Sequence, residues 1–198
     1  MLNRLRESLQ PAMERLGESF ASTGLSADFW TAFGLAVSFA ASVAYASAAL
    51  GFNQYLALVA GGALLLLSGF FDVVDGSVAR ITKRTSNRGA FLDSTFDKIA
   101  EVSIFVGISF GRLADPILCM LALGLSLLVS YTRSRAETLG VRLQGIGIGE
   151  RAERILIIAI LGMLPFSGAM QWAVLLVIIV AGITLCQRIV FTAKKLST

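Results

Sequence analysis

Four aspartates stand at regular intervals near the middle of the chain, in the stretches Asp72-Val-Val-Asp75-Gly76 and Gly89-Ala-Phe-Leu-Asp93-Ser-Thr-Phe-Asp97. In a helix, Asp72 and Asp75 share one face with Gly76, and the residues spaced by four, Asp93 and Asp97, share one stripe. Two consecutive helices joined by a short loop are antiparallel neighbours. We therefore expect the two acidic faces to meet.

Carboxylates that face one another in a partly dehydrated site repel, and each buried charge is costly near a membrane. A divalent cation removes this conflict, and an all-oxygen ligand set favours Mg²⁺ or Mn²⁺ over Zn²⁺. The predicted metal ligands are Asp72, Asp75, Asp93 and Asp97. Two ions fit if a carboxylate bridges them. One such aspartate alone could be a structural hydrogen-bonding residue or a snorkelling group, but four at these spacings favour a metal site.

Small residues share the acidic faces. These are Gly76, Ala79 and Gly89. Because they carry little or no side chain, they leave room for a nucleotide to approach the helix backbone.

The composition indicates a membrane protein. Of 198 residues, 56% are hydrophobic and 15% charged, whereas soluble domains carry about 25% charged residues. Long apolar runs predict an all-α integral membrane fold with six transmembrane helices, at roughly 29–50, 55–79, 90–111, 114–138, 152–168 and 169–192. No histidine is present, which excludes imidazole chemistry. Cys119 and Cys186 lie inside apolar runs, so we expect small core residues and no disulfide.

An amphipathic helix is expected before the first span, over residues 1–22, because apolar residues recur there at helical spacing: Leu2, Leu5, Leu9, Met13, Leu16 and Phe20. It would lie along the membrane interface. No linker or repeat divides residues 1–198, which predicts a single domain whose six-helix bundle covers 29–192.

The cations orient the bundle. They gather before the first predicted span, between spans 2 and 3, between spans 4 and 5, and after span 6, for example Arg4, Arg15, Lys83, Arg88, Arg142, Arg151 and Lys194. The connections on the opposite side of the membrane contain a single cation, Arg112. The positive-inside rule then places both termini and the acidic site in the cytoplasm. This arrangement explains the net charge of +4 without a nucleic-acid partner.

The spacing D-x2-D-G-x2-A-R-x8-G-x3-D-x3-D resembles the signature of the CDP-alcohol phosphotransferase family, and every fixed position is present. The resemblance implies a six-helix membrane fold that dimerises, with Asp72, Asp75 and Asp93 as metal ligands and Asp97 as general base near the metals. It also implies contacts to the CDP group from Asp72, Asp75, Gly76, Ala79, Arg80, Gly89 and Asp93. The stretch Gly24–Thr31 resembles the family's G-x-S-P-N-x-x-T lead-in, with Ala27 and Asp28 in place of Pro and Asn.

Three arginines around the predicted spans 4 to 6 suggest a phosphate receptor, because guanidinium groups match phosphate geometry. They are Arg133, Arg154 and Arg188. The alternative is ordinary cytoplasmic cations paired with glutamates. The form Y-x-R-x-R-A-E … G-x-G-x-x-E-R-x-E-R resembles phosphatidylinositol phosphate and archaetidylinositol phosphate synthases. By that resemblance the three arginines grip the phosphate of inositol 1-phosphate.

The expected reaction joins a CDP-linked lipid, either CDP-archaeol or CDP-diacylglycerol, to inositol 1-phosphate and releases CMP. Asp97 would accept the proton of the attacking hydroxyl. A phosphatidylglycerolphosphate-type synthase using glycerol 3-phosphate is the alternative enzyme. A cation-coupled transporter is the alternative outside enzymes, because intramembrane carboxylates also mark ion pathways.

Overall fold

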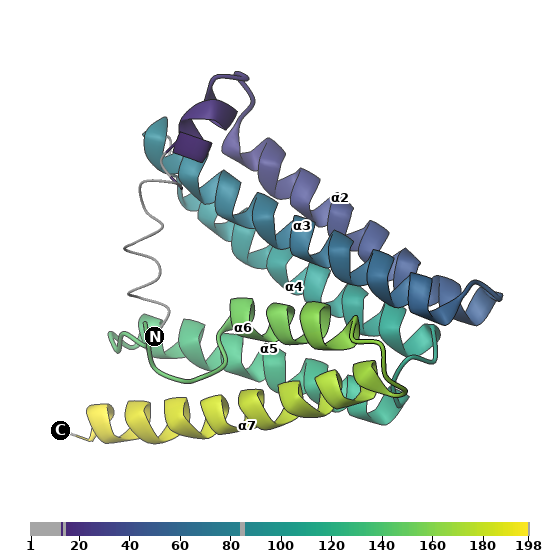
Figure 1. The fold of residues 1–198 in the computed structure, drawn as a ribbon. Helices are drawn as coiled ribbons and strands as arrows, with labels where there is room; N and C mark the ends of the chain where they lie inside the picture. The colour runs from purple at the N-terminus through teal and green to yellow at the C-terminus, as the bar shows by residue number, and fades with distance from the viewer. Residues whose placement is uncertain (1–12, 14, 84–85, 198) are drawn as a thin grey trace.

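The computed structural model describes residues 13, 15–83 and 86–197, and this part of the chain forms helices and turns without a β-strand (Figure 1). The helices are α2 (Ala27–Ala46), α3 (Gln54–Ile81), α4 (Asn87–Phe110), α5 (Pro116–Thr138), α6 (Arg151–Leu156) and α7 (Ala169–Leu196). A 3-10 turn, Ser47–Leu50, follows α2, and a π-helical turn, Ile157–Leu161, follows α6. The predicted all-α class is confirmed. Residues 15–21 are helical, but Leu2, Leu5 and Leu9 of the predicted amphipathic helix lie outside the described residues.

Short polar side chains set where the helices begin. The Ser26 hydroxyl accepts a hydrogen bond from the Phe29 amide at 3.2 Å, and Asn53 Oδ1 accepts one from the Leu56 amide at 3.0 Å. Asp115 Oδ1 caps α5 in the same way, 2.8 Å from the Ile117 amide. Each cap satisfies a backbone donor that has no partner within its helix, so these residues fix the helix boundaries.

Four helical segments are long and apolar enough to cross a membrane: Ala27–Leu50, Gln54–Ile81, Pro116–Thr138 and Ala169–Leu196. They coincide with the predicted spans 1, 2, 4 and 6. The third predicted span forms α4, whose 24 residues include Asp93, Asp97, Lys98 and Glu101. The fifth forms six residues of α6 and five of the π turn. At 1.5 Å per residue this arm measures about 16 Å, roughly half the hydrocarbon thickness of a bilayer.

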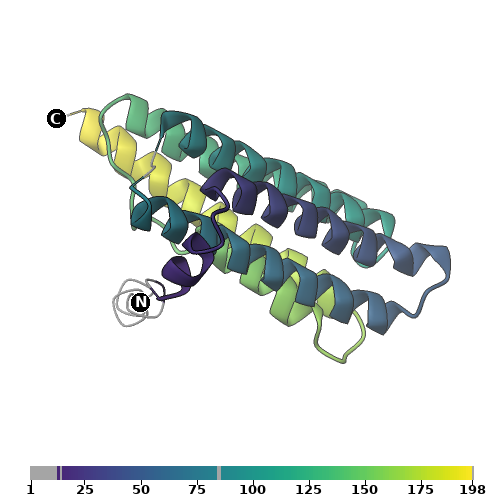
Figure 2. The ribbon, with the colours of Figure 1, turned by 90° about the horizontal axis from the view of Figure 1, so that it is seen from above.

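The bundle consists of two groups of helices. Helix α2 lies along both α3 and α4, whereas α5 lies along α7 (Figure 1 and Figure 2). The Ser68 hydroxyl donates to the Gly34 carbonyl at 2.9 Å, and the Ser42 hydroxyl donates to the Ser103 carbonyl at 2.5 Å. A side chain at Gly107 would overlap the backbone of Ser42, so glycine permits the close approach of α2 and α4. These contacts fix α2 against α3 and α4, the two helices that carry the four aspartates.

The outer surface of the bundle is apolar. Large hydrophobic side chains stay exposed on every long helix, among them Val43, Val106, Ile117, Trp172 and Ile179. Such a surface suits contact with lipid and not with water. Cys119 is buried, as predicted, but Cys186 is exposed on α7, so its assignment to the core was wrong. A residue inside an apolar run can face either the core or the lipid, and the run alone does not distinguish the two.

Candidate active site

The acidic residues gather where α3 ends and α4 begins. Helix α3 runs to Ile81, and the Ser86 hydroxyl starts α4 by accepting a hydrogen bond from the Gly89 amide at 3.0 Å. Helices α5 and α7 also end on this side of the molecule, at the left in Figure 1. The acidic faces of α3 and α4 meet at this end, as predicted, but the two helices do not pack along each other; α2 lies along both.

Three of the four predicted metal ligands converge. One carboxylate oxygen each from Asp72, Asp75 and Asp93 lies within 4.8 Å of the other two. Asp75 is only 6% exposed, and its Oδ2 has no hydrogen-bond partner among the described residues. A buried carboxylate oxygen without a partner is costly, so this oxygen is available to bind a cation.

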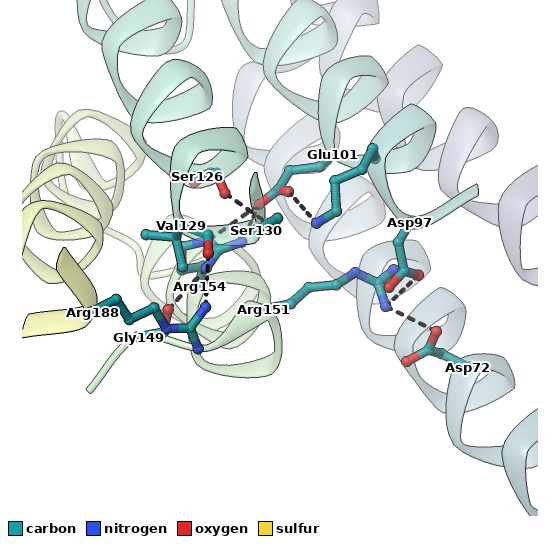
Figure 3. A network of polar contacts seen from close by, with 11 residues as sticks. Asp72, Asp97, Glu101, Ser126, Val129, Ser130, Gly149, Arg151, Arg154 and Arg188 are labelled. Carbon is teal, nitrogen blue, oxygen red and sulfur yellow. Dashed lines mark hydrogen bonds and ion pairs between the residues drawn. The ribbon is translucent and has the colours of Figure 1, made fainter. Parts of the chain in front are cut away.

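The fourth aspartate, Asp97, stands beside this triad and pairs with an arginine. Its Oδ1 lies 2.7 Å from Arg151 Nη1, and the same nitrogen lies 2.8 Å from Asp72 Oδ1 (Figure 3). Arg151 thus connects α3 to α4 from the start of α6. Asp97, predicted both as a fourth metal ligand and as the general base, is not among the three residues whose ligand atoms converge.

The donor set fits a hard divalent cation. The triad offers carboxylate oxygens alone, and the unpartnered Asp75 Oδ2 is buried within it. Without a bound cation, the repulsion among the three converging carboxylates would be uncompensated. Arg151 does not remove it, because it contacts only Asp72 of the three. The residues present therefore match the predicted Mg²⁺ or Mn²⁺ site.

A pocket of about 240 Å³ opens beside the triad and contains most of the residues predicted to surround the CDP group. The predicted residues that line it are Asp75, Gly76, Ala79, Arg80, Gly89 and Asp93. Asp72 lines a smaller neighbouring pocket together with Asp97 and Arg151. Thr31 and Asp75 line both pockets, so the two pockets are adjacent.

The lead-in to α2 contributes the remaining wall of the larger pocket. Ala27, Asp28 and Thr31 line it together with Ser86 and Ala90. Ala27 and Asp28 are the two positions where the chain departs from the lead-in motif of the family it resembles. The departure therefore falls on side chains that line the larger pocket.

Arg154, predicted to hold the acceptor phosphate, lies in the protein interior. It is 3% exposed, and its Nη2 lies 2.8 Å from Glu101 Oε1 (Figure 3). Its Nε donates to the same oxygen at 3.2 Å, and its Nη1 donates to the Gly149 carbonyl at 2.9 Å. Lys98 binds the other oxygen of Glu101 at 3.1 Å. The Arg154 guanidinium thus holds the start of α6 against α4.

Arg188 has a similar structural environment, and Arg133 does not. Arg188 is 2% exposed, and it donates to the carbonyls of Val129 and Ile146 at 2.8 Å and 3.0 Å. It thereby fixes the loop between α5 and α6. Arg133 is exposed and makes an ion pair with Glu137 one turn along α5, at 3.0 Å. The three arginines are close enough to interact electrostatically, but only Arg133 presents its guanidinium to solvent.

Two residues of this site were not singled out from the sequence. Arg151 had been grouped with the cytoplasmic cations, and Glu101 had no assigned role. The spacing Asp93, Asp97, Glu101 continues the acidic stripe by one more turn, and this signal could have indicated Glu101. Arg151 lies 54 residues after Asp97, across a loop whose path no sequence pattern specifies.

Comparison with known proteins agrees with this geometry. Residues 25–192 match the family of CDP-alcohol phosphatidyltransferases. The archaetidylinositol phosphate synthase of Methanothermobacter thermautotrophicus is 38% identical over 99% of this chain and 96% of its own length. The synthase of the same name from Pyrococcus horikoshii is 38% identical over 98% of this chain and 97% of its own.

The fold is likewise similar to a solved structure of phosphatidylinositol phosphate synthase from Mycobacterium tuberculosis with CDP-DAG bound. That structure has a TM-score of 0.76 and 26% identity, over 91% of this chain and 92% of the other. A second structure of that enzyme, in complex with manganese and citrate, gives a TM-score of 0.75. The matched residues include the whole aspartate motif and its pocket, and the chain belongs to the CDP-alcohol phosphatidyltransferase family.

Proposed function

We propose that this chain transfers a phosphatidyl-type group from a CDP-linked lipid to inositol 1-phosphate and releases CMP. One observation carries the proposal: three carboxylates converge at the wall of a pocket lined by the residues expected to surround CDP. The relatives named archaetidylinositol phosphate synthase, at 38% identity over almost the whole chain, support inositol phosphate as the acceptor.

The chain's residues divide the work as follows. Asp72, Asp75 and Asp93 would hold Mg²⁺ or Mn²⁺, as one ion or two. When bound, the ions polarise the pyrophosphate and stabilise CMP as it leaves. Gly76, Ala79 and Gly89 admit the nucleotide.

Asp97 accepts the proton of the attacking hydroxyl. It lies in the pocket next to Asp72 and Asp75, within reach of a group bound between the two pockets. Arg151 fixes its carboxylate through the contact at 2.7 Å. No histidine is present in the chain, so a carboxylate is the natural general base, and direct in-line displacement needs no covalent intermediate.

The acceptor phosphate binds at the basic cluster of Arg133, Arg154 and Arg188. In this proposal the exposed Arg133 contacts the phosphate. The buried Arg154 and Arg188 add positive charge and hold the loop between α5 and α6 in place. The sequence predicted that all three arginines bind the phosphate, whereas this proposal assigns the direct contact to Arg133.

The proposal also includes the six predicted passes, of which the fifth is the short segment 151–161. It further includes the amphipathic N-terminus and the cytoplasmic position of both termini. The chain acts as one membrane domain and as a homodimer, as the family resemblance implies. The four long apolar helices and the apolar outer surface support its place in a membrane. Protease protection of tagged termini in sealed vesicles tests the orientation.

The decisive assay is CMP release by purified protein in detergent. It contains a CDP-linked lipid, Mg²⁺ or Mn²⁺, and either inositol 1-phosphate or glycerol 3-phosphate. Asp97→Asn removes the proposed base. Asp115→Asn is the matched control, because Asp115 caps α5 at the opposite end of the bundle and asparagine can cap equally well.

Release of CMP with inositol 1-phosphate, lost in Asp97→Asn and kept in Asp115→Asn, is the expected result. Release with glycerol 3-phosphate alone would keep the reaction and replace the acceptor. Folded protein that releases no CMP with either acceptor, tested with both lipid types, would contradict the enzyme assignment. That result would favour the alternative of a cation-coupled transporter.

A further inference from the structure

Arg151 occupies an unusual position for a cation. Its side chain is 19% exposed, and one nitrogen, Nη1, contacts carboxylates of two helices, Asp72 at 2.8 Å and Asp97 at 2.7 Å. Its Nε is buried and has no hydrogen-bond partner among the described residues. Among the described residues, the ion pairs of this guanidinium are those with Asp72 and Asp97, and these two pairs hold it at the acids.

A rigid arm delivers this guanidinium. Arg151 is the first residue of α6, and Arg154 follows one turn later. The buried contact between Arg154 and Glu101, together with the bond from Arg154 to the Gly149 carbonyl, fixes the backbone on either side of Arg151 (Figure 3). Because its backbone cannot drift, the charge of Arg151 remains beside Asp72 and Asp97.

We propose that Arg151 is a resident counter-cation of the acidic site, which weakens the binding of divalent cations and favours the negatively charged CDP-lipid. This inference rests on the proposed metal site. A positive charge in contact with Asp72 repels a divalent ion bound to the same carboxylate, and in a partly buried site water screens that repulsion weakly. The same charge attracts the pyrophosphate of the lipid substrate. Neutralising Arg151 should therefore change the two affinities in opposite directions.

The test uses Mn²⁺ alone with the purified full chain, and the EPR signal of the free ion measures binding. In Arg151→Gln the dissociation constant for Mn²⁺ should fall at least about fivefold, because the repelling charge is gone. Arg151→Lys keeps the charge and should remain close to the wild-type value. Arg142→Gln is the matched control, since Arg142 is exposed in the loop before α6 and its loss changes the net charge equally.

The second readout is CMP release at saturating Mn²⁺, where Arg151→Gln should raise the KM for CDP-lipid. Unchanged or weaker Mn²⁺ binding in Arg151→Gln would overturn the inference. If Arg151 merely supported the site, its replacement would lower the affinities for both Mn²⁺ and CDP-lipid. Arg151→Met gives the same test if the glutamine variant does not fold. Mn²⁺ binding that persists in Asp93→Asn would instead refute the proposed metal site, so the two failures are distinguishable.

Discussion

The acidic and the basic clusters lie at the same end of the bundle, but they use their charges differently. The acids leave an unpartnered oxygen on Asp75 and border an open pocket of about 240 Å³. Arg154 and Arg188, the buried members of the basic cluster, bond to a carboxylate and to backbone carbonyls. The unpartnered carboxylate of Asp75 is therefore available to a ligand, whereas the paired guanidinium groups of Arg154 and Arg188 hold the structure together.

The sharpest way to test this contrast is Asp75→Asn. CMP release should fall by about a thousandfold, equivalent to roughly 4 kcal/mol, because a ligand of the proposed metal is lost. Stability should be unchanged or higher, because a repelling buried charge is removed. Unfolding in SDS titrations of detergent-purified protein, followed by circular dichroism, measures the second quantity. A loss of stability as large as the loss of activity would assign Asp75 to the structure.

Arg154→Ala, unlike Asp75→Asn, should cause a large loss of stability. It leaves Glu101 buried without its main partner, and breaking a buried ion pair in this way costs about 3 kcal/mol or more. The same SDS titration measures the change.

A double variant separates the two roles of Arg154. Arg154→Met with Glu101→Leu removes both charges and should recover most of the stability, since apolar replacement of a whole buried pair is well tolerated. A recovered fold with the KM for inositol 1-phosphate near the wild-type value would confirm a structural role. A recovered fold with a greatly raised KM would show that Arg154 contacts the acceptor.

The smallest effect is expected at Arg133. Its ion pair with Glu137 is exposed, so Arg133→Ala should change stability by less than about 0.5 kcal/mol. The KM for inositol 1-phosphate should rise about three- to tenfold, because one charge-assisted hydrogen bond to phosphate is lost. Steady-state CMP release at varied acceptor measures this, with Arg142→Ala as control. A rise for CDP-lipid instead would place Arg133 at the nucleotide.

The sequence was most informative where the site lies on continuous helices. Helical spacing alone placed Asp72 and Asp75 on one face and Asp93 and Asp97 on one stripe, and the structure brings Asp72, Asp75 and Asp93 together. The short loop between α3 and α4 was enough to predict that their acidic faces meet, although the two helices pack along α2 and not along each other. These are local rules, and they hold without knowledge of the remaining chain.

The contacts of the basic cluster could not be predicted from the sequence, because they join residues that are far apart in the chain. Arg154 finds Glu101, 53 positions away, and Arg188 finds the carbonyl of Ile146 in an irregular loop. An arginine bound to a phosphate and an arginine bound to a buried glutamate look the same in the sequence. The length of α6 was also missed, because the apolar run from Ile155 to Phe166 continues beyond Leu161, where the α6 and π-helical segments end.

The contact between Gly107 and Ser42 limits how α2 and α4 can move. The two backbones touch there, and the Ser42 hydroxyl binds the Ser103 carbonyl at 2.5 Å, so neither helix can slide along the other without losing this fit. Asp28 and Thr31 on α2 therefore travel with Gly89 and Asp93 on α4 as one rigid wall. That side of the larger pocket therefore keeps its shape when a headgroup enters, because Asp28 and Gly89 cannot move apart.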